Sequence, residues 1–569
     1  MALPSEGPAN RRPWPLILAS IAVAYAAADT YVAVVALQPM MHSVGLEETQ
    51  IQKAAPIVSG FLLGYVAMLP LIGRIADVRG RIPVLRWGLF LFSFGSIITA
   101  VAYSMPTLIA GRFLQGIGGG ALVPATLALV ADLYPAGRRA VPLGIVSAVQ
   151  EAGSVLGPML GAAILAVSSW RGIFWVNVAV GAALWLGLSA SAARTRRRVD
   201  WIGLALAILL AIGVYLVLHP PMSIKQDIFW GEIYVPHGSS PRWTTDVGLV
   251  TVGIAVVLLA WCLLGRSAAV NLRDWARATR EVDLIGAGIL GVSLGGIVIA
   301  FASADPQIQM VSSTGWMWLA GSAIAAALFV IRCRVAKAPL IPRGALGAVP
   351  AWGGLVISLL VGVTLVTALV TVPAFAQTDG NDSPTRAAFV LVRLLVALPF
   401  GAYLGGLLTH RTSPRLVGSL GLLCATVGLW LMSNWQHGAL DHASATVALV
   451  VAGFGFGLVL APVNTAVLGA TPSDVHGLAS ALTVVARMIG MLVGVSFLTV
   501  LALHTLYADA PSVESVCHST TVCDAYGNQL AASAVTPMRA MFRGAFWVGL
   551  FASAAAAVLL GRSPAHRPE

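Results

Sequence analysis

Apolar residues occur along this chain in long unbroken runs, separated by short polar segments that hold most of the arginines. About 20 residues of α-helix, rising about 1.5 Å per residue, cross the apolar core of a bilayer. Strands of a membrane barrel would instead alternate polar and apolar positions over about ten residues. The pattern predicts about sixteen membrane-spanning helices, at 15–38, 54–73, 84–104, 107–131, 140–168, 171–190, 201–218, 246–264, 284–303, 315–331, 351–376, 387–408, 416–434, 444–470, 477–503 and 540–560.

The distribution of positive residues predicts how these helices are oriented. If the N-terminus lies in the cytoplasm and the spans alternate, the cytoplasmic segments hold 24 of the 34 Lys and Arg residues. Short cytoplasmic loops of membrane proteins carry such an excess of positive charge. We therefore expect a multi-pass protein of a bacterial plasma membrane with both termini in the cytoplasm.

Composition narrows the class of protein further. Hydrophobic residues make up 58% of the chain and charged residues 10%, against about 25% charged residues in soluble domains. The net charge of +11 lies in loops rather than in a basic patch with aromatics, so nucleic-acid binding is not predicted. Ser, His and acidic residues do not cluster, so we do not expect an enzyme. The five cysteines lack metal-ligand spacing, and no metal or cofactor is expected.

Charged residues inside apolar runs are candidates for function, because placing a charge in a bilayer costs free energy. Asp29 and Glu151 are the acids deep in the first six spans, and we predict that they carry protons. Arg112, Arg393 and Arg487 also lie within spans and are candidate charge partners. Ion pairs that only lock helices together are the alternative interpretation.

Small residues recur at intervals of four beside Glu151. Gly153, Gly157 and Gly161 share one face of the predicted helix, and Pro158 interrupts the same span. Such a stripe lets a second helix approach closely, and proline bends a helix. We predict a helix-packing motif here.

The loop after the second span contains Gly73, Asp77, Arg79, Gly80 and Arg81. It resembles the signature loop of the major facilitator superfamily, with Val and Ile at two positions where that loop has Arg and Lys. The stretches Asp29–Val32, Arg112–Gly116 and Gly153–Gly161 resemble the drug:proton antiporters of that superfamily.

The resemblance implies an all-α polytopic fold of two six-helix lobes around a central cavity, with linker helices between the lobes. It also implies a cytoplasmic gate at the 73–81 loop. Here the linker would contain about four helices, in two pairs. We expect Asp77 to lie near the N-terminus of the span that starts at Gly477, with Ser473 as a candidate cap.

A closer similarity covers both halves of the chain. Gln150–Ser154, Trp170–Asn177, Ala397–Gly401, His476–Ser480 and Val485–Met488 are similar to mycobacterial exporters that work with a lipid-carrying lipoprotein. This implies proton-coupled export of triacylglycerides or other apolar or amphiphilic molecules, with such a lipoprotein as an external partner. Two alternatives stay open: a multidrug:proton antiporter without a lipid role, and a membrane scaffold or sensor that does not transport.

An internal repeat divides the middle of the chain. Val199–Gly203 recurs as Val282–Gly286, each copy opening a pair of spans, which favours a duplicated hairpin. The predicted domains are a first lobe at 1–198, linker hairpins at 199–281 and 282–345, and a second lobe at 346–569.

Two predicted external segments contain further candidate features. Aromatic residues mixed with charges in 219–244 suit either an interfacial belt or a docking surface. Cys517 and Cys523 share a polar segment where a disulfide could persist, and two free thiols are the alternative.

Overall fold

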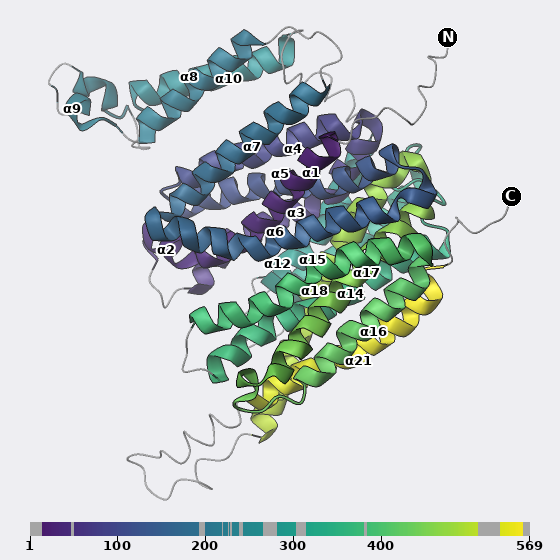
Figure 1. Ribbon diagram of the computed structural model, residues 1–569. Helices are drawn as coiled ribbons and strands as arrows, with labels where there is room; N and C mark the ends of the chain where they lie inside the picture. The colour runs from purple at the N-terminus through teal and green to yellow at the C-terminus, as the bar shows by residue number, and fades with distance from the viewer. Residues whose placement is uncertain are drawn as a thin grey trace, which may run out of the picture. The chain divides into compact units, whose positions relative to one another are not determined.

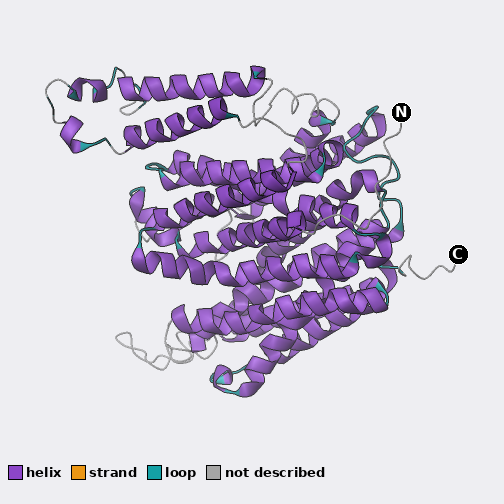
Figure 2. Ribbon diagram, turned by 45° about the horizontal axis from the view of Figure 1, so that its top comes forward, coloured by secondary structure: helices purple, strands orange, loops and turns teal. Residues whose placement is uncertain are grey.

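The structure is a computed structural model of the 569-residue chain. It describes residues 14–46, 51–192, 200–218, 220–225, 227, 230–237, 243–265, 282–302, 315–379, 384–509 and 535–561. Throughout these ranges the regular elements are helices, and no strand occurs in them (Figure 2). The predicted all-α class is confirmed. Helices suit apolar runs in a bilayer because each satisfies its own backbone hydrogen bonds.

Every predicted span except the first falls on one long helix of the described chain, and the first falls mostly on α1. The first six are α1 (Trp14–Val35), α3 (Ile51–Arg79), α4 (Arg81–Ala100), α5 (Met105–Leu133), α6 (Ala140–Val167) and α7 (Trp170–Ala192). The middle four are α8 (Trp201–Leu218), α10 (Asp246–Leu264), α12 (Leu284–Ala302) and α13 (Gly315–Val335). The last six are α14 (Val349–Asp379), α15 (Pro384–Arg411), α16 (Pro414–Met432), α17 (Ala443–Gly469), α18 (His476–Asp509) and α21 (Val535–Leu559).

Short elements join these helices. They are α2 (Leu37–Ser43), α9 (Met222–Lys225) and the 3-10 helices η3 (Ala136–Arg138), η4 (Gly231–Tyr234), η5 (Ala439–Asp441) and η6 (Ser473–Val475). The first predicted span, 15–38, is not one continuous helix, because a turn at Ala36 separates α1 from α2.

Fourteen described helices are long and apolar enough to cross a membrane, by length and composition. The apolar helical stretches Trp14–Thr30 and Trp201–Val217, in α1 and α8, are shorter. The expected number of about sixteen therefore corresponds to fourteen full-length helices and two shorter ones.

The chain forms two compact units. One contains residues Met1–Leu188 and Asp283–Glu569, and the other contains Ser189–Val282. In the smaller unit α8 and α10 lie side by side, with α9 and η4 between them in sequence (Figure 1). This unit nearly coincides with the predicted hairpin 199–281, whereas the full division into four domains stays a prediction.

The same helix pairings recur in both halves of the larger unit. α1 packs on α6 as α14 packs on α18, and α3 packs on α5 as α15 packs on α17. The halves then meet through corresponding helices, α3 with α18 and α6 with α15. Such pairing is typical of structural repeats arranged around a central site.

Glycines permit both contacts between the halves. A Cβ atom at Gly73 of α3 would lie 2.5 Å from the carbonyl oxygen of Gly477 in α18. A Cβ atom at Gly406 of α15 would lie 2.7 Å from the carbonyl oxygen of Ala140 in α6. Any larger side chain would push the helices apart, so these glycines set how closely the halves approach.

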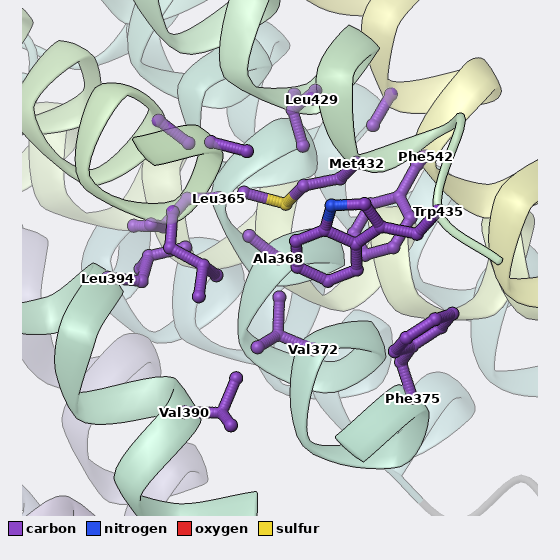
Figure 3. Close-up of a cluster of buried hydrophobic side chains, with 14 of the residues drawn as sticks. Leu365, Ala368, Val372, Phe375, Val390, Leu394, Leu429, Met432, Trp435 and Phe542 are labelled. Atoms are coloured by element: carbon purple, nitrogen blue, oxygen red, sulfur yellow. The ribbon is translucent and has the colours of Figure 1, made fainter. Parts of the chain in front are cut away.

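Aromatic side chains fill part of the core in the second half (Figure 3). The ring of Trp435 lies between those of Phe375 and Phe542, at centroid distances of 5.1 and 5.8 Å. Buried aliphatic residues from α14, α15 and α16 surround them, among them Val372, Leu394 and Leu429. Edge and tilted aromatic pairs of this kind add stabilisation beyond the burial of their area.

The two middle hairpins begin in the same way. Asp200 accepts a hydrogen bond from the Gly203 amide at 2.8 Å, and Asp283 accepts one from the Gly286 amide at 3.0 Å. Each aspartate thus caps its helix, α8 or α12. Each is also bonded by the second helix of its pair, through the Trp261 indole at 3.1 Å or the Arg332 guanidinium at 3.0 Å. The repeated cap supports the duplication inferred from sequence.

The second hairpin also packs against both halves of the larger unit. α12 lies against α3 and α18. A Cβ atom at Gly295 would lie 3.0 Å from the Leu63 side chain, which shows how close α12 and α3 are.

Candidate functional site

Asp29 lies in a buried polar network inside the first half. Its side chain is held by two helices: Arg112 of α5 donates to one carboxylate oxygen at 2.8 Å, and Asn177 of α7 donates to the other. Arg112 also donates to Gln115 at 2.7 Å, and its guanidinium carbon lies 4.5 Å from the centre of the Phe61 ring. Asp29 and Arg112 are 3% and 0% exposed, so this ion pair is shielded from solvent.

The structure therefore brings two predicted residues, Asp29 and Arg112, together. Asn177 was not among the predicted site residues, although it lies in the segment Trp170–Asn177 that resembles the mycobacterial exporters. An amide side chain within the apolar run 171–190 was the signal, because polar groups inside spans need partners.

Glu151 and Arg487 form an ion pair between the two halves. Glu151 of α6 and Arg487 of α18 approach to 3.9 Å, with 11% and 12% of their side chains exposed. This separation is too long for a hydrogen bond but leaves a substantial Coulomb attraction in a partly buried site. Because the partners belong to different halves, the pair depends on the halves being close.

A cavity of about 200 Å³ lies next to this pair. Its wall comes from α1, α3, α5, α6, α14 and α18, so both halves contribute. Apolar side chains dominate it, including Val58, Phe61, Leu62, Leu365 and Met491. The polar residues on the wall are Thr30, Tyr65, Arg112, Gln150, Glu151, Ser154 and Arg487.

A smaller cavity with more polar lining continues from Glu151 and Arg487. Ser147 lies one helical turn before Glu151, and Thr483 lies one turn before Arg487; both line this cavity together with Asn464. The acid–base pair therefore lies on the wall of both cavities.

The predicted glycine stripe packs α6 onto α1. Cβ atoms at Gly153 and Gly157 would lie 2.1 and 2.4 Å from the carbonyl oxygens of Ala24 and Ala28. Gly161 lies against Val32, one turn further, and Pro158 lies within α6. The stripe holds α6, and with it Glu151, directly against the helix that carries Asp29.

The second half has an equivalent stripe of glycines, which was not predicted from the sequence. Cβ atoms at Gly490 and Gly494 of α18 would lie 2.0 Å from the Leu359 carbonyl oxygen and 2.8 Å from the Val363 Cα. The four-residue spacing was visible in the sequence. This stripe holds α18, and hence Arg487, against α14.

Residues 73–81 were expected to form a loop, but they form the end of α3, a turn at Gly80 and the start of α4, and they join the two halves at one end of the bundle. Asp77 accepts hydrogen bonds from the backbone amides of Gly477 at 2.7 Å and Leu478 at 3.0 Å. Its carboxylate also pairs with Arg81, one turn along the chain. Asp77 thus lies at the start of α18, as expected from the sequence, and its carboxylate rather than the candidate cap Ser473 accepts the hydrogen bonds of these two amides.

Other residues of this region complete the contact. Arg81 also pairs with Asp132 at 3.2 Å, and Arg74 donates to the Asp474 carbonyl oxygen at 2.8 Å. Gly80 has a φ of 96°, which favours glycine and allows the sharp turn between α3 and α4. Arg79 is half-buried at the end of α3.

Two predictions of side-chain chemistry have other outcomes. Arg393 was expected to pair with a charge, but it donates to the Thr446 hydroxyl at 3.0 Å and forms no ion pair within the described part of the chain. Thr446 lies on the neighbouring α17, so the partner that the structure gives Arg393 is a hydroxyl, and a role as a charge partner stays a prediction. Cys517 and Cys523 lie outside the described residues, so their pairing stays a prediction.

The chain is similar in sequence to a family of membrane transporters and to several proteins within it. Residues 18–495 match the sequence profile of the Major Facilitator Superfamily. A triacylglyceride transporter of Mycobacteroides abscessus is 34% identical over 498 residues, covering 86% of this chain and 82% of that protein. A triacylglyceride transporter of Mycolicibacterium smegmatis is 34% identical over 490 residues, covering 84% and 74%. One from Mycobacterium tuberculosis is 34% identical over 500 residues, covering 85% and 82%.

Solved structures share the fold at low sequence identity. The proton:xylose symporter XylE is similar with a TM-score of 0.55 and 14% identity, covering 96% of this chain and 95% of that one. The human organic anion transporter MFSD10 gives a TM-score of 0.52 and 14% identity, covering 95% and 100%.

Proposed function

This chain belongs to the Major Facilitator Superfamily, and from that premise we propose that it exports triacylglyceride-like lipids in exchange for protons. It is a multi-pass membrane transporter, and the relatives named triacylglyceride transporters suggest the substrate. The observation that carries the proposal is the apolar cavity between the halves, with the Glu151–Arg487 ion pair on its wall. An apolar cavity suits a lipid, and a titratable pair between moving parts suits coupling.

Glu151 is the residue we assign to coupling between the halves. At 3.9 Å and an effective dielectric constant of about 20, two unit charges attract by about 4 kcal/mol before desolvation is counted. Protonation of Glu151 removes this attraction and favours separation of α6 from α18. Proton binding therefore shifts the balance between two arrangements of the halves, which is what alternating access requires.

Asp29 is the second proposed proton carrier. Arg112 and Asn177 hold its charged form, so a proton must compete with these two donors. This network lies within one half, whereas the Glu151–Arg487 pair joins both. The two acids thus have different roles. Protonation of Asp29 changes hydrogen bonds within one half, whereas protonation of Glu151 weakens an ion pair between the two halves.

The contact of Asp77 with α18 is the proposed cytoplasmic gate. The arginine distribution supports placing this end of the bundle, and both termini, in the cytoplasm of a plasma-membrane protein. While the carboxylate caps α18, the halves are closed at that end. An external lipid-carrying lipoprotein is the proposed acceptor of the exported lipid.

Transport by purified protein in vesicles tests this function. Vesicles with an imposed pH gradient are loaded with labelled triacylglyceride or with a cationic dye. We expect gradient-dependent lipid movement that Glu151→Gln and Asp29→Asn abolish. Glu232→Gln, which changes an exposed acid in η4, is the matched control and leaves transport unchanged.

Three results would contradict the proposal. Dye movement without lipid movement would favour the multidrug antiporter. Movement of neither would favour the scaffold or sensor. Full gradient-driven lipid transport in both acid variants would show that protons are carried elsewhere.

A further inference from the structure

Most polar side chains on the wall of the larger cavity are already engaged. The hydroxyls of Thr30 and Ser154 each donate to the carbonyl oxygen four residues earlier in their own helix, at 3.2 and 3.4 Å. Arg112 donates to Asp29 and to a neighbouring amide. Glu151 and Arg487 face each other across the two halves.

The Tyr65 hydroxyl and the half-buried Gln150 side-chain amide line this cavity without a hydrogen bond to the residues that the structure describes, and the Arg112 Nε on the same wall is buried without a partner. Tyr65 is 7% exposed, and its ring packs against Phe61 at a centroid distance of 5.9 Å. Its hydroxyl lies within electrostatic range of both Glu151 and Arg487. Gln150 directly precedes Glu151 on α6.

A buried donor without an acceptor is unfavourable, so such groups fit a ligand that supplies one. The remaining wall is apolar, with Val58, Leu62 and Met491 among its residues. The ligand must therefore combine large apolar parts with a few acceptor atoms. A hydrocarbon lacks the acceptors, and an organic cation could pair with Glu151 but would leave the Tyr65 and Gln150 donors without an acceptor.

We propose that Tyr65 and Gln150 form a binding subsite for the ester carbonyl oxygens of a neutral acylglycerol, an inference that rests on the proposed lipid export. The cavity of about 200 Å³ is smaller than the pockets of about 300–1,000 Å³ that enclose drug-sized ligands. It therefore takes the glycerol-ester region, and the acyl chains extend beyond it. The subsite therefore recognises the ester groups of the lipid rather than its acyl chains.

The subsite predicts discrimination between ester and ether lipids. A trialkyl ether of glycerol has the same chains but no carbonyl oxygens, so the two donors would stay unpaired when it binds. Sites that hydrogen-bond one group of a substrate discriminate strongly against analogues that lack it. Chain length, by contrast, should matter little to the subsite.

Equilibrium binding of trioleoylglycerol and its triether analogue to the full chain in lipid nanodiscs tests the inference. We expect the wild type to bind the ester about tenfold more tightly than the ether, the scale of one or two hydrogen bonds. Tyr65→Phe should reduce this ratio about threefold, through weaker ester binding with unchanged ether binding. Gln150→Met should reduce it in the same way.

Tyr25→Phe is the matched control, since Tyr25 packs edge-on against Phe92 and does not line the cavity. It should leave the ratio unchanged. Equal binding of both lipids by the wild type, binding of neither, or a wild-type ratio in Tyr65→Phe and Gln150→Met would overturn the subsite. Ester discrimination without gradient-driven transport would retain the subsite and reject the proposed export function, so the two failures are distinguishable.

Discussion

Replacing Asp77 by asparagine measures how strongly the end of α3 holds the start of α18. The aspartate side chain is fully buried and accepts two backbone hydrogen bonds across the interface, at 2.7 and 3.0 Å. Asparagine keeps one acceptor oxygen and loses the negative charge. Arg81 belongs to the same half as Asp77, so we expect their pairing to persist when the halves separate and its loss to cancel largely between the two states.

The size of the effect depends on the free energy that the contacts of Asp77 with α18 contribute to the closed state. A hydrogen bond to a charged group contributes about 1.5–3 kcal/mol, and a charge at a helix N-terminus contributes about 0.3–1 kcal/mol. Losing one such bond and the charge, with the other bond kept in neutral form, weakens the closed state by about 2 kcal/mol. At about 1.4 kcal/mol per tenfold change, the separated state should become about 30-fold more populated.

The rate of cysteine labelling in a cavity between the halves measures the population of the separated state. In a chain whose five native cysteines are replaced by serine, Leu127→Cys places a thiol on the wall of the smaller cavity, where it is buried. We expect Asp77→Asn to increase the rate of labelling by a maleimide about 30-fold. Asp474→Asn removes the same charge from an exposed side chain nearby and serves as the control. A rate within twofold of the parent, or an equal rise with Asp474→Asn, would refute the gate.

Three further changes test the packing and the domain division. Gly153→Val should destabilise the protein by about 1–3 kcal/mol or more in thermal unfolding, because its Cβ would lie 2.1 Å from the Ala24 carbonyl oxygen; Gly288→Ala, which meets open space, should not. Asn177→Ala should cost about 1.5–3 kcal/mol through the lost bond to a charged carboxylate, and exposed Asn434→Ala should cost less; equal costs would count against the network. Deleting 199–281 should leave a folded protein with some transport and a C-terminal reporter in the cytoplasm; an external reporter or an unfolded product would show that this segment is integral to the core.

Several features were predictable because they depend on local sequence. The length of each apolar run determines a membrane helix, since an apolar chain in a bilayer must satisfy its hydrogen bonds internally. The stripe from Gly153 to Gly161 was visible for a similar reason, because helical periodicity fixes which residues share a face. The buried acids Asp29 and Glu151 were visible as charges within apolar spans.

The partners of these residues depend on how distant helices pack. Asp77 and Gly477 are 400 positions apart, and Arg112 and Asp29 are 83 apart, so no local pattern relates them. Arg393 illustrates the limit: its place in a span suggested a charged partner, but packing of α15 on α17 gives it the Thr446 hydroxyl. Sequence alone determined where the helices and buried charges are. Only the tertiary structure decided which charges meet. The close packing of α1 with α6, α3 with α18 and α6 with α15 determines which helix faces come together, and the charges on those faces become partners.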